Sequence, residues 1–353
     1  MPESTSLFRS ALFDSLVSAP PEKRYPVEFW LGALFFILLA CVPWLASFLG
    51  EPFYVRLLMR MMIFSIMALS LNLILGYGGM VSFGHSMFVG VAAYVVGILG
   101  YHAYEANALA IGPFQIQGSL NALFTWPIAV AATALVALML GAVVLRTSGL
   151  YFIMITLALA QMLYFLAVSM EDYGGEDGLQ VMGTQMLGNL DLSHRTTLYY
   201  VVWVCLCGVF LGCRTLVNSR FGLVLKASRQ NADRLRAIGL PVFWYKLVAF
   251  VISGAIAGLA GVLLVSSQSF VSPADMAWTR SGDLIVMVVI GGMGSLFGPV
   301  LGAFFYLAAE YVLGNITEYW QMIMGPLLIV IVLYARTGIV GVFLGAGERK
   351  NRI

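Results

Sequence analysis

Two glycine-rich clusters hold the residues of this chain whose types and spacing are best suited to chemistry. The first cluster reads GYGGMVSFGH and ends at His85, and the second reads IGGMGSLFG and ends at Gly298. Glycine breaks or tightens helices, and backbone carbonyls freed inside a membrane must be buried in protein or line a cavity. Two related breaks in the two halves of one chain point to a translocation path. The expected chemistry is therefore the binding and passage of a solute.

The two clusters correspond nearly position by position, with Leu296 as a one-residue insertion. The matching residues are Gly78, Gly79, Met80, Ser82, Phe83 and Gly84 in the first cluster and Gly291, Gly292, Met293, Ser295, Phe297 and Gly298 in the second. Residues in and near the clusters, with one further polar residue, make up the candidate path: Asn72, Tyr77, Gly78, Gly79, Ser82, His85, Gln161, Gly291, Gly292 and Gly294.

Three of these polar candidates have a second interpretation. Asn72 and Gln161 are neutral side chains within apolar spans, where they either hydrogen-bond to neighbouring helices or touch the solute. His85 follows the first glycine pair, where it either satisfies a freed backbone carbonyl or binds the solute. The sequence leaves both alternatives open for each residue.

The sequence argues against catalysis, metal binding and ATP binding. No Ser/His/Asp set, HExxH motif or paired carboxylate lies at membrane depth, so we expect no enzyme activity. The cysteines form no CxxC pair and are expected to be small apolar residues, with no metal site: Cys41, Cys205, Cys207 and Cys213. A Walker A loop needs a Gly-Lys-Ser/Thr unit, and none of the lysines follows glycine. We therefore expect no cofactor in this chain.

The composition indicates an integral membrane protein. Of the 353 residues, 61% are hydrophobic and 10% are charged, whereas a soluble domain has about 25% charged residues. A formal net charge of +2 is too small to suggest nucleic acid as a partner. Apolar runs near the length of a bilayer-spanning helix are frequent, so we predict an all-α, polytopic helical membrane protein.

The apolar spans and the basic residues together predict a topology. The spans lie near residues 30–49, 53–75, 80–100, 122–145, 150–170, 197–213, 246–267, 284–312 and 319–335. Lys and Arg gather in the two tails and between residues 214 and 246, which should be cytoplasmic. Two cytoplasmic termini require an even number of crossings. We therefore expect about ten membrane segments, with 284–312 as a glycine-broken hairpin that counts as two.

Residues 219–250 read SRFGLVLKASRQNADRLRAIGLPVFWYKLVAF. This pattern predicts a short basic helix that Gly239 ends in the left-handed conformation, after which Pro241 prevents its continuation. A new membrane helix should begin near Tyr245. The basic segment either serves only to orient the chain or forms a docking element for a cytoplasmic partner.

Five motifs resemble one known family. The run SRFG…ASRQNADRLRAIGL…YKLVAFVISGAIAGLAG resembles the cytoplasmic signature of bacterial ABC-importer permeases of the branched-chain amino-acid type. The runs GYGGMVSFGHSMFVGVAAY, ITLALAQMLYF, GGEDGL and VMVVIGGMGSLFGPVLGA resemble the same family. The resemblance covers residues 57–341, and the order and spacing of the motifs make it specific.

The resemblance implies an M-type permease subunit of the bacterial inner (plasma) membrane, with both termini cytoplasmic. It would pair with a second, homologous permease subunit. Two cytoplasmic ATPase subunits, which bind the ATP, would dock on a coupling helix at residues 228–239. A periplasmic substrate-binding protein would deliver leucine, isoleucine or valine, and the importer would work by alternating access. Close relatives of the family carry urea, short amides or other amino acids.

The same resemblance implies a set of residues for docking the ATPases: Arg220, Phe221, Gly222, Arg229, Asp233, Arg236, Ile238 and Gly239. The family's usual acidic residue early in the coupling helix is absent here, where the run is SRQNAD.

The apolar spans and the resemblance together predict three parts of the chain. Residues 1–28 form a cytoplasmic tail, which is either a helix on the membrane surface or a frayed end. Residues 29–341 form the transmembrane permease domain, with the coupling-helix loop at 214–245. Residues 342–353 form a second cytoplasmic tail.

Two other functional classes stay open. A stand-alone secondary transporter or channel would need a charge near the middle of the membrane. Arg56, Arg60 and Glu310 fall near the outer ends of their spans, and we expect no acidic or basic residue at mid-membrane, which disfavours this class. A structural subunit that carries nothing would not explain two glycine-broken segments.

Overall fold

The computed structural model describes residues 26–49, 52–105, 108–111, 114–181, 185–188, 190–334 and 338–339. The C-terminal tail and residues 1–25 of the N-terminal tail lie outside the described residues. The chain divides into two compact units, residues 1–41 and 42–353. Helix α2 (Pro26–Leu49) begins in the first unit and ends in the second. Everything that follows concerns the second unit.

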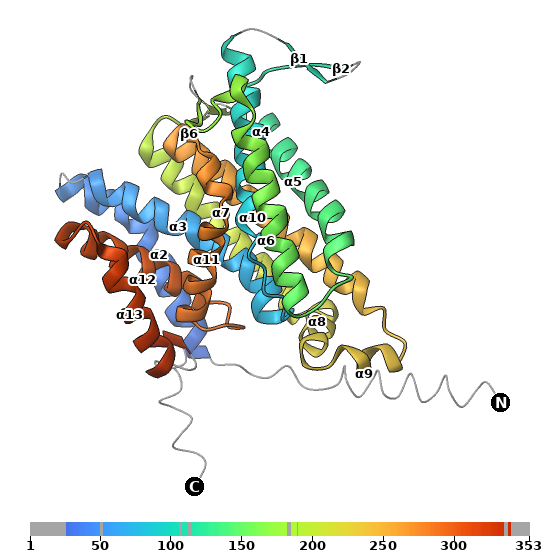
Figure 1. The fold of residues 1–353 in the computed structure, drawn as a ribbon. Helices are drawn as coiled ribbons and strands as arrows, with labels where there is room; N and C mark the ends of the chain where they lie inside the picture. Colours follow the sequence, from blue (N-terminus) through green and yellow to red (C-terminus); the bar gives the residue numbers. More distant parts are fainter. Residues whose placement is uncertain are drawn as a thin grey trace. The chain divides into compact units, whose positions relative to one another are not determined.

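Helices dominate the second unit, which confirms the prediction of an all-α, polytopic membrane protein (Figure 1). The long helices are α3 (Pro52–Asn72), α4 (Ser86–Tyr104), α5 (Ala122–Val144), α6 (Leu150–Val168), α7 (Arg195–Asn218), α10 (Val242–Gln268) and α12 (Gly298–Ile316). The shorter helices are η1 (Leu73–Tyr77), η2 (Glu171–Tyr173), α8 (Arg220–Gln230), α9 (Ala232–Ala237), η3 (Pro273–Met276), α11 (Trp278–Gly291) and α13 (Trp320–Tyr334).

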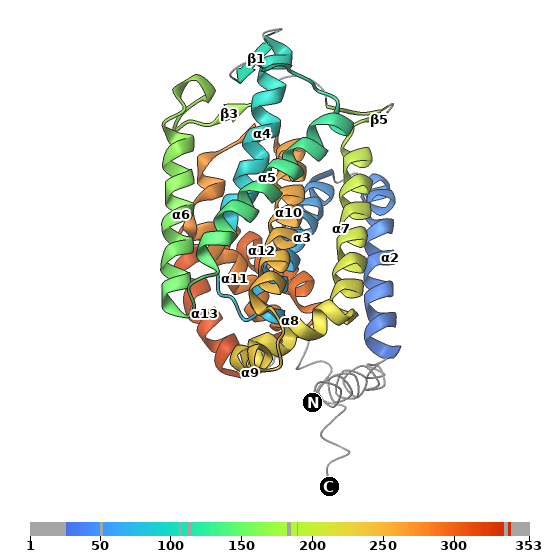
Figure 2. The same cartoon turned by 90° about the vertical axis from the view of Figure 1, so that its right-hand side faces the viewer.

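The strands are short and pair antiparallel. They are β1 (Ala108–Ile111) with β2 (Phe114–Gln117), β3 (Leu179–Gln180) with β6 (Phe270–Val271), and β4 (Met186–Leu187) with β5 (Leu190–Asp191). In Figure 2, the labelled strands lie at one end of the long helices, and α8 and α9 lie at the other end. The two ends therefore differ in structure.

Seven helices in the described residues are long and apolar enough to cross a membrane. Two shorter apolar helices, Leu34–Leu45 and Trp320–Ile329, and helix α11 add to these. The expected hairpin at 284–312 is present: α11 and α12 are separated by residues 292–297. Helix α11 begins at Trp278, earlier than the apolar span indicated. The count of about ten segments is therefore approximate.

Helices α3, α4 and α10 form the core, because most of their residues are buried, whereas most of α5, α6 and α7 is not. Small residues on α10 allow its close approach to its neighbours. A β-carbon at Gly258 would lie 2.9 Å from Thr133 of α5, and one at Gly261 would overlap the Val89 carbonyl of α4. In the view of Figure 2, α6 and α7 lie on opposite sides of the α5–α10 pair.

The coupling region differs from the single helix expected at residues 228–239. Helix α8 ends at Gln230, and α9 starts at Ala232, so that one residue separates the two helices. Asn231 between them is extended, with φ −158° and ψ 101°, and its side chain accepts a hydrogen bond from the Arg234 amide. An asparagine that caps the next helix ends the preceding one. Gly239 has φ 84°, as expected of a left-handed helix end.

Candidate functional site

Asn72 joins the two glycine-rich breaks. We define the first break as residues 78–85 and the second break as residues 292–297. Asn72 is buried at the end of α3; its Nδ2 donates to the Ser295 carbonyl at 2.8 Å, and its Oδ1 accepts from the Gly294 amide at 3.1 Å. Both the nitrogen and the oxygen of the Asn72 amide thus have a hydrogen-bond partner. If the two atoms were exchanged, the amide nitrogen would face the Gly294 N–H and neither hydrogen bond could form. A single side chain therefore fixes the second break against the helix that leads into the first.

The two breaks share local geometry as well as sequence. In the first break, Ser82 Oγ accepts from the Gly84 amide at 3.4 Å. In the second, Ser295 Oγ accepts from the Gly298 amide at 3.0 Å. Glycines with a positive φ occur in both breaks, at Gly79 (69°) in the first and at Gly292 (114°) and Gly294 (81°) in the second, a region that side chains disfavour. The correspondence seen in the sequence therefore extends to the backbone.

Arg229 of α8 reaches the same junction. Its Nη1 donates a hydrogen bond to the Gly76 carbonyl, near the end of η1. The last carbonyls of a helix have no partner within the helix and attract a cation. A β-carbon at Gly79 would lie 2.8 Å from Arg229 Cγ, and one at Gly294 would lie 3.6 Å from Arg229 Nη1. Arg229 therefore touches both breaks, and α8 is connected to them through one side chain.

Helix α8 is also packed on the membrane helices. Leu225 lies in a buried cluster with Leu73 and Tyr77 of η1. The Lys226 ammonium lies 5.4 Å from the centre of the Tyr77 ring, within the range of a cation–π contact. The Phe221 and Tyr245 rings are 5.7 Å apart. Helix α8 is thus attached to η1 and α10.

The residues expected to dock a partner fall into two groups. Arg220, Asp233, Arg236, Ile238 and Gly239 are exposed. Phe221 and Gly222 face inward, where Phe221 packs beside Tyr245 and a β-carbon at Gly222 would overlap the Val217 carbonyl. Arg229 is exposed overall but turns its guanidinium to the breaks. Arg236 pairs with Asp233 at 2.9 Å. Of the residues expected to dock a partner, the exposed group is open to solvent in the described part of the chain.

His85 is fully buried, and its Nε2 lies 2.7 Å from Ser70 Oγ. Ser70 donates its own proton to the Met67 carbonyl at 2.6 Å. The histidine must therefore donate from Nε2, so Nδ1 is an acceptor, and it has no partner in the described part of the chain. The expected bond to a freed backbone carbonyl is not found among the described residues, because the partner of Nε2 is a hydroxyl of α3. His85 ties the end of the first break to that helix.

Gln161 does not join the site. It lies half-buried on α6, more than one turn beyond Thr156, and makes no hydrogen bond with the described residues of either break. Thr156 does contact the first break, since its Oγ1 accepts from the Phe83 amide at 3.3 Å.

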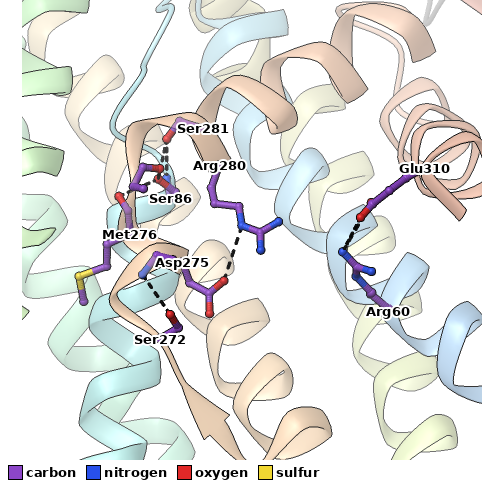
Figure 3. Close-up of polar contacts among 10 residues, drawn as sticks. Arg60, Ser86, Ser272, Asp275, Met276, Arg280, Ser281 and Glu310 are labelled. Atoms are coloured by element: carbon purple, nitrogen blue, oxygen red, sulfur yellow. Dashed lines mark hydrogen bonds and ion pairs between the residues drawn. The ribbon is translucent and has the colours of Figure 1, made fainter. Parts of the chain in front are cut away.

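A serine pair that the sequence analysis missed fixes the start of α4 to α11 (Figure 3). The Ser86 amide donates to Ser281 Oγ at 2.9 Å, and the two hydroxyl oxygens are 2.7 Å apart. Ser86 Oγ also bonds to the Ala277 carbonyl at 2.9 Å. The predicted apolar span begins at residue 284. It did not include Ser281, so the sequence did not predict these contacts.

Charged side chains form pairs between helices, and the sequence did not predict these pairs. Asp275 pairs with Arg280 at 3.7 Å, and Arg60 pairs with Glu310 at 3.1 Å (Figure 3). Asp283 on α11 accepts a hydrogen bond from the Tyr306 hydroxyl at 2.8 Å. The run WTRSGDL at residues 278–284 was the available signal. Each of these acids has a partner, so none is an isolated charge.

Comparison with known proteins adds independent information. The profile of the family described as "Branched-chain amino acid transport system / permease component" matches residues 53–332. The high-affinity branched-chain amino acid transport system permease protein LivM of Salmonella typhimurium is 26% identical over 79% of this chain and 68% of its own length. A probable LivM of Methanocaldococcus jannaschii is 24% identical over 79% of this chain and 90% of its own length.

A second kind of relative covers less of the chain. The probable permease protein LivH of Methanocaldococcus jannaschii is 31% identical over 40% of this chain and 47% of its own length. No solved structure gives a significant match.

Proposed function

The chain belongs to the branched-chain amino acid transport permease family, and we propose that it is the M-type permease subunit of an ATP-driven importer in a bacterial inner membrane. Relatives named LivM match far more of the chain than relatives named LivH. A second permease of the LivH kind is therefore the proposed partner in the membrane. Leucine, isoleucine and valine are the proposed substrates, with urea, amides or other amino acids as the alternative.

The contact of Arg229 with both breaks carries this proposal. The ATPases would dock on the exposed residues of α9 and the start of α8, on the cytoplasmic side. Because Arg229 bonds to Gly76 and lies against Gly79 and Gly294, a displacement of α8 reaches both breaks directly. The backbone of the breaks lacks the continuous hydrogen bonds of a helix, so it changes conformation more easily than the helices do. Alternating access would then follow from rearrangement at these two points.

ATP hydrolysis is assigned to the partner subunits, because the sequence has no Walker A loop. In this proposal the chain is not an enzyme and binds no cofactor of its own. A periplasmic binding protein would deliver the substrate at the end of the helices opposite α8.

The test is recovery of the tagged chain from its native membrane in mild detergent, with mass spectrometry of its companions, followed by uptake measurements in proteoliposomes. We expect two ATPase subunits, a second permease and leucine uptake that requires ATP and the binding protein. Recovery of the chain alone, with uptake insensitive to ATP, would instead favour the stand-alone transporter. The pair of Arg280 on α11 with Asp275 on η3 would then be its ion site. Uptake of urea but not leucine would favour the alternative substrates.

A further inference from the structure

A cleft of about 490 Å³ lies between α3, α12 and α13. Its volume falls in the range of about 300–1,000 Å³ that is usual for small-molecule sites. The polar part of its lining includes Arg56, Arg60 and Glu310. Phe53, Tyr311 and Trp320 supply an aromatic wall, and the Phe53 and Tyr311 ring centres are 5.2 Å apart. The cleft thus combines both signs of charge with an apolar surface.

The charges in the cleft are not balanced. Arg60 Nη2 lies 3.1 Å from Glu310 Oε1 and 3.5 Å from Oε2, so these two residues compensate each other. Arg56 lies one helical turn before Arg60, and residues four apart share a helix face. Arg56 is exposed and has no hydrogen-bond or ion-pair partner among the described residues. One guanidinium in the cleft is therefore available for an anion.

We propose that this cleft binds a free amino acid as its zwitterion, an inference that rests on the proposed function and names the substrate class of the site. The carboxylate would bind Arg56, whose fork of donors matches a carboxylate in two parallel hydrogen bonds. The ammonium would bind Glu310, because an ionised carboxylate has about four acceptor positions and Arg60 occupies only part of them. The aliphatic side chain would pack on Phe53, Tyr311 and Trp320.

This lining favours an amino acid over the alternative substrates. Urea and short amides carry no charge, so they would leave Arg56 without a counter-ion. Burial of an aliphatic side chain against the aromatic wall also stabilises binding, and urea has no such side chain.

The cleft and the coupling contact lie at opposite ends of one continuous element. Arg56 and Gly76 are separated by twenty residues of α3 and η1, which corresponds to about 30 Å at 1.5 Å per residue. This is about the thickness of the hydrocarbon core of a bilayer. The same helix therefore carries the cleft at one end and the carbonyl held by Arg229 at the other.

The test compares Arg56→Gln and Glu310→Gln in the complete transporter in nanodiscs. Arg195→Gln is the matched control, because Arg195 is exposed at the start of α7. The measurements are binding of radiolabelled leucine in the absence of the binding protein, and leucine uptake with it. We expect both cleft variants to weaken leucine binding at least about tenfold, the loss expected for one charge-assisted hydrogen bond. The Arg195→Gln control should bind and import leucine as the wild type does.

Wild-type affinity in both cleft variants would overturn the inference while leaving the importer assignment intact. Failure of the wild-type complex to import any of the proposed substrates with ATP, whether an amino acid, urea or an amide, would instead overturn the proposed function. A phosphatidylethanolamine headgroup offers the same ammonium and anion, so the binding is repeated in nanodiscs with and without this lipid. In a further outcome, leucine binds in neither kind of nanodisc, while phosphatidylethanolamine is retained by the wild type and lost from Arg56→Gln. This result would assign the cleft to lipid and overturn the inference.

Discussion

The guanidinium of Arg229 donates a hydrogen bond to the carbonyl of Gly76, although 153 positions separate the two residues. Gly76 lies in the π-helical turn that ends the α3 segment, and Arg229 lies in the last turn of α8. A basic residue of the loop between α7 and α10 is thereby inserted among the backbone groups of both breaks. In the proposed importer, this one contact would connect the docking surface with the segments that rearrange.

Replacing Arg229 with glutamine should uncouple transport. The shorter neutral side chain cannot reach the Gly76 carbonyl, so movement of α8 is no longer transmitted to the breaks. We expect ATP-dependent leucine uptake in proteoliposomes to fall by about tenfold or more, which corresponds to about 1.4 kcal/mol in the coupled step. ATP hydrolysis should persist.

Arg146→Gln is the control for that experiment, since Arg146 is exposed in the turn between α5 and α6. Arg229→Lys should give an intermediate result, because lysine keeps the charge but not the fork of donors. Normal uptake by Arg229→Gln would show that the contact does not transmit the movement.

Replacing Asn72 with leucine should destabilise the junction of the breaks. The Gly294 amide and the Ser295 carbonyl would lose their partner in a partly buried place, at a cost of up to about 1–3 kcal/mol for each unsatisfied group. We expect a lower unfolding temperature in detergent and reduced uptake. Asn218→Leu, at an exposed position near the end of α7, is the control. An unchanged unfolding temperature in Asn72→Leu would contradict the bridging role.

The sequence predicted the helical class, the two breaks and the left-handed end at Gly239, because each depends on local composition. Glycine pairs within apolar spans mark breaks wherever they occur, and the relation between Ser82 and Ser295 was visible as a repeated motif. The hairpin was predicted because the parity of the crossings required it. None of these predictions depends on knowing which helices pack against one another.

The contacts across the site could not be predicted, because they join residues far apart in the chain. Asn72 meets Gly294 at a separation of 222 positions, and either a helix neighbour or the solute could have satisfied its amide. Arg229 was expected at the docking surface, since nothing local indicates that its side chain turns inward. The charges on α11 were missed because hydropathy sets the start of a span at its first apolar residue, whereas the helix starts at Trp278.

Replacing His85 with leucine should affect stability more than substrate recognition. His85 is fully buried and bonds to Ser70, so its loss removes one hydrogen bond between the first break and α3. A loss of about 1 kcal/mol is expected for such a bond, seen as a modest fall in unfolding temperature. The KM for leucine uptake should stay within about twofold, because the side chain does not line the cleft. A large rise in KM with unchanged stability would place His85 on the path instead.

Replacing Arg236 and Gly239 together with alanine should separate ATP hydrolysis from transport without preventing membrane insertion. The Arg236–Asp233 pair is exposed, and exposed pairs contribute about 0–1 kcal/mol. Alanine at Gly239 must adopt a φ of 84°, which disturbs the turn after α9. We expect normal amounts of protein in the membrane, weak recovery of the ATPases and little uptake. Arg234→Ala, at an exposed position of α9 outside the expected docking set, serves as the control and should transport normally. Wild-type uptake by the double variant would show that the ATPases dock elsewhere on the chain.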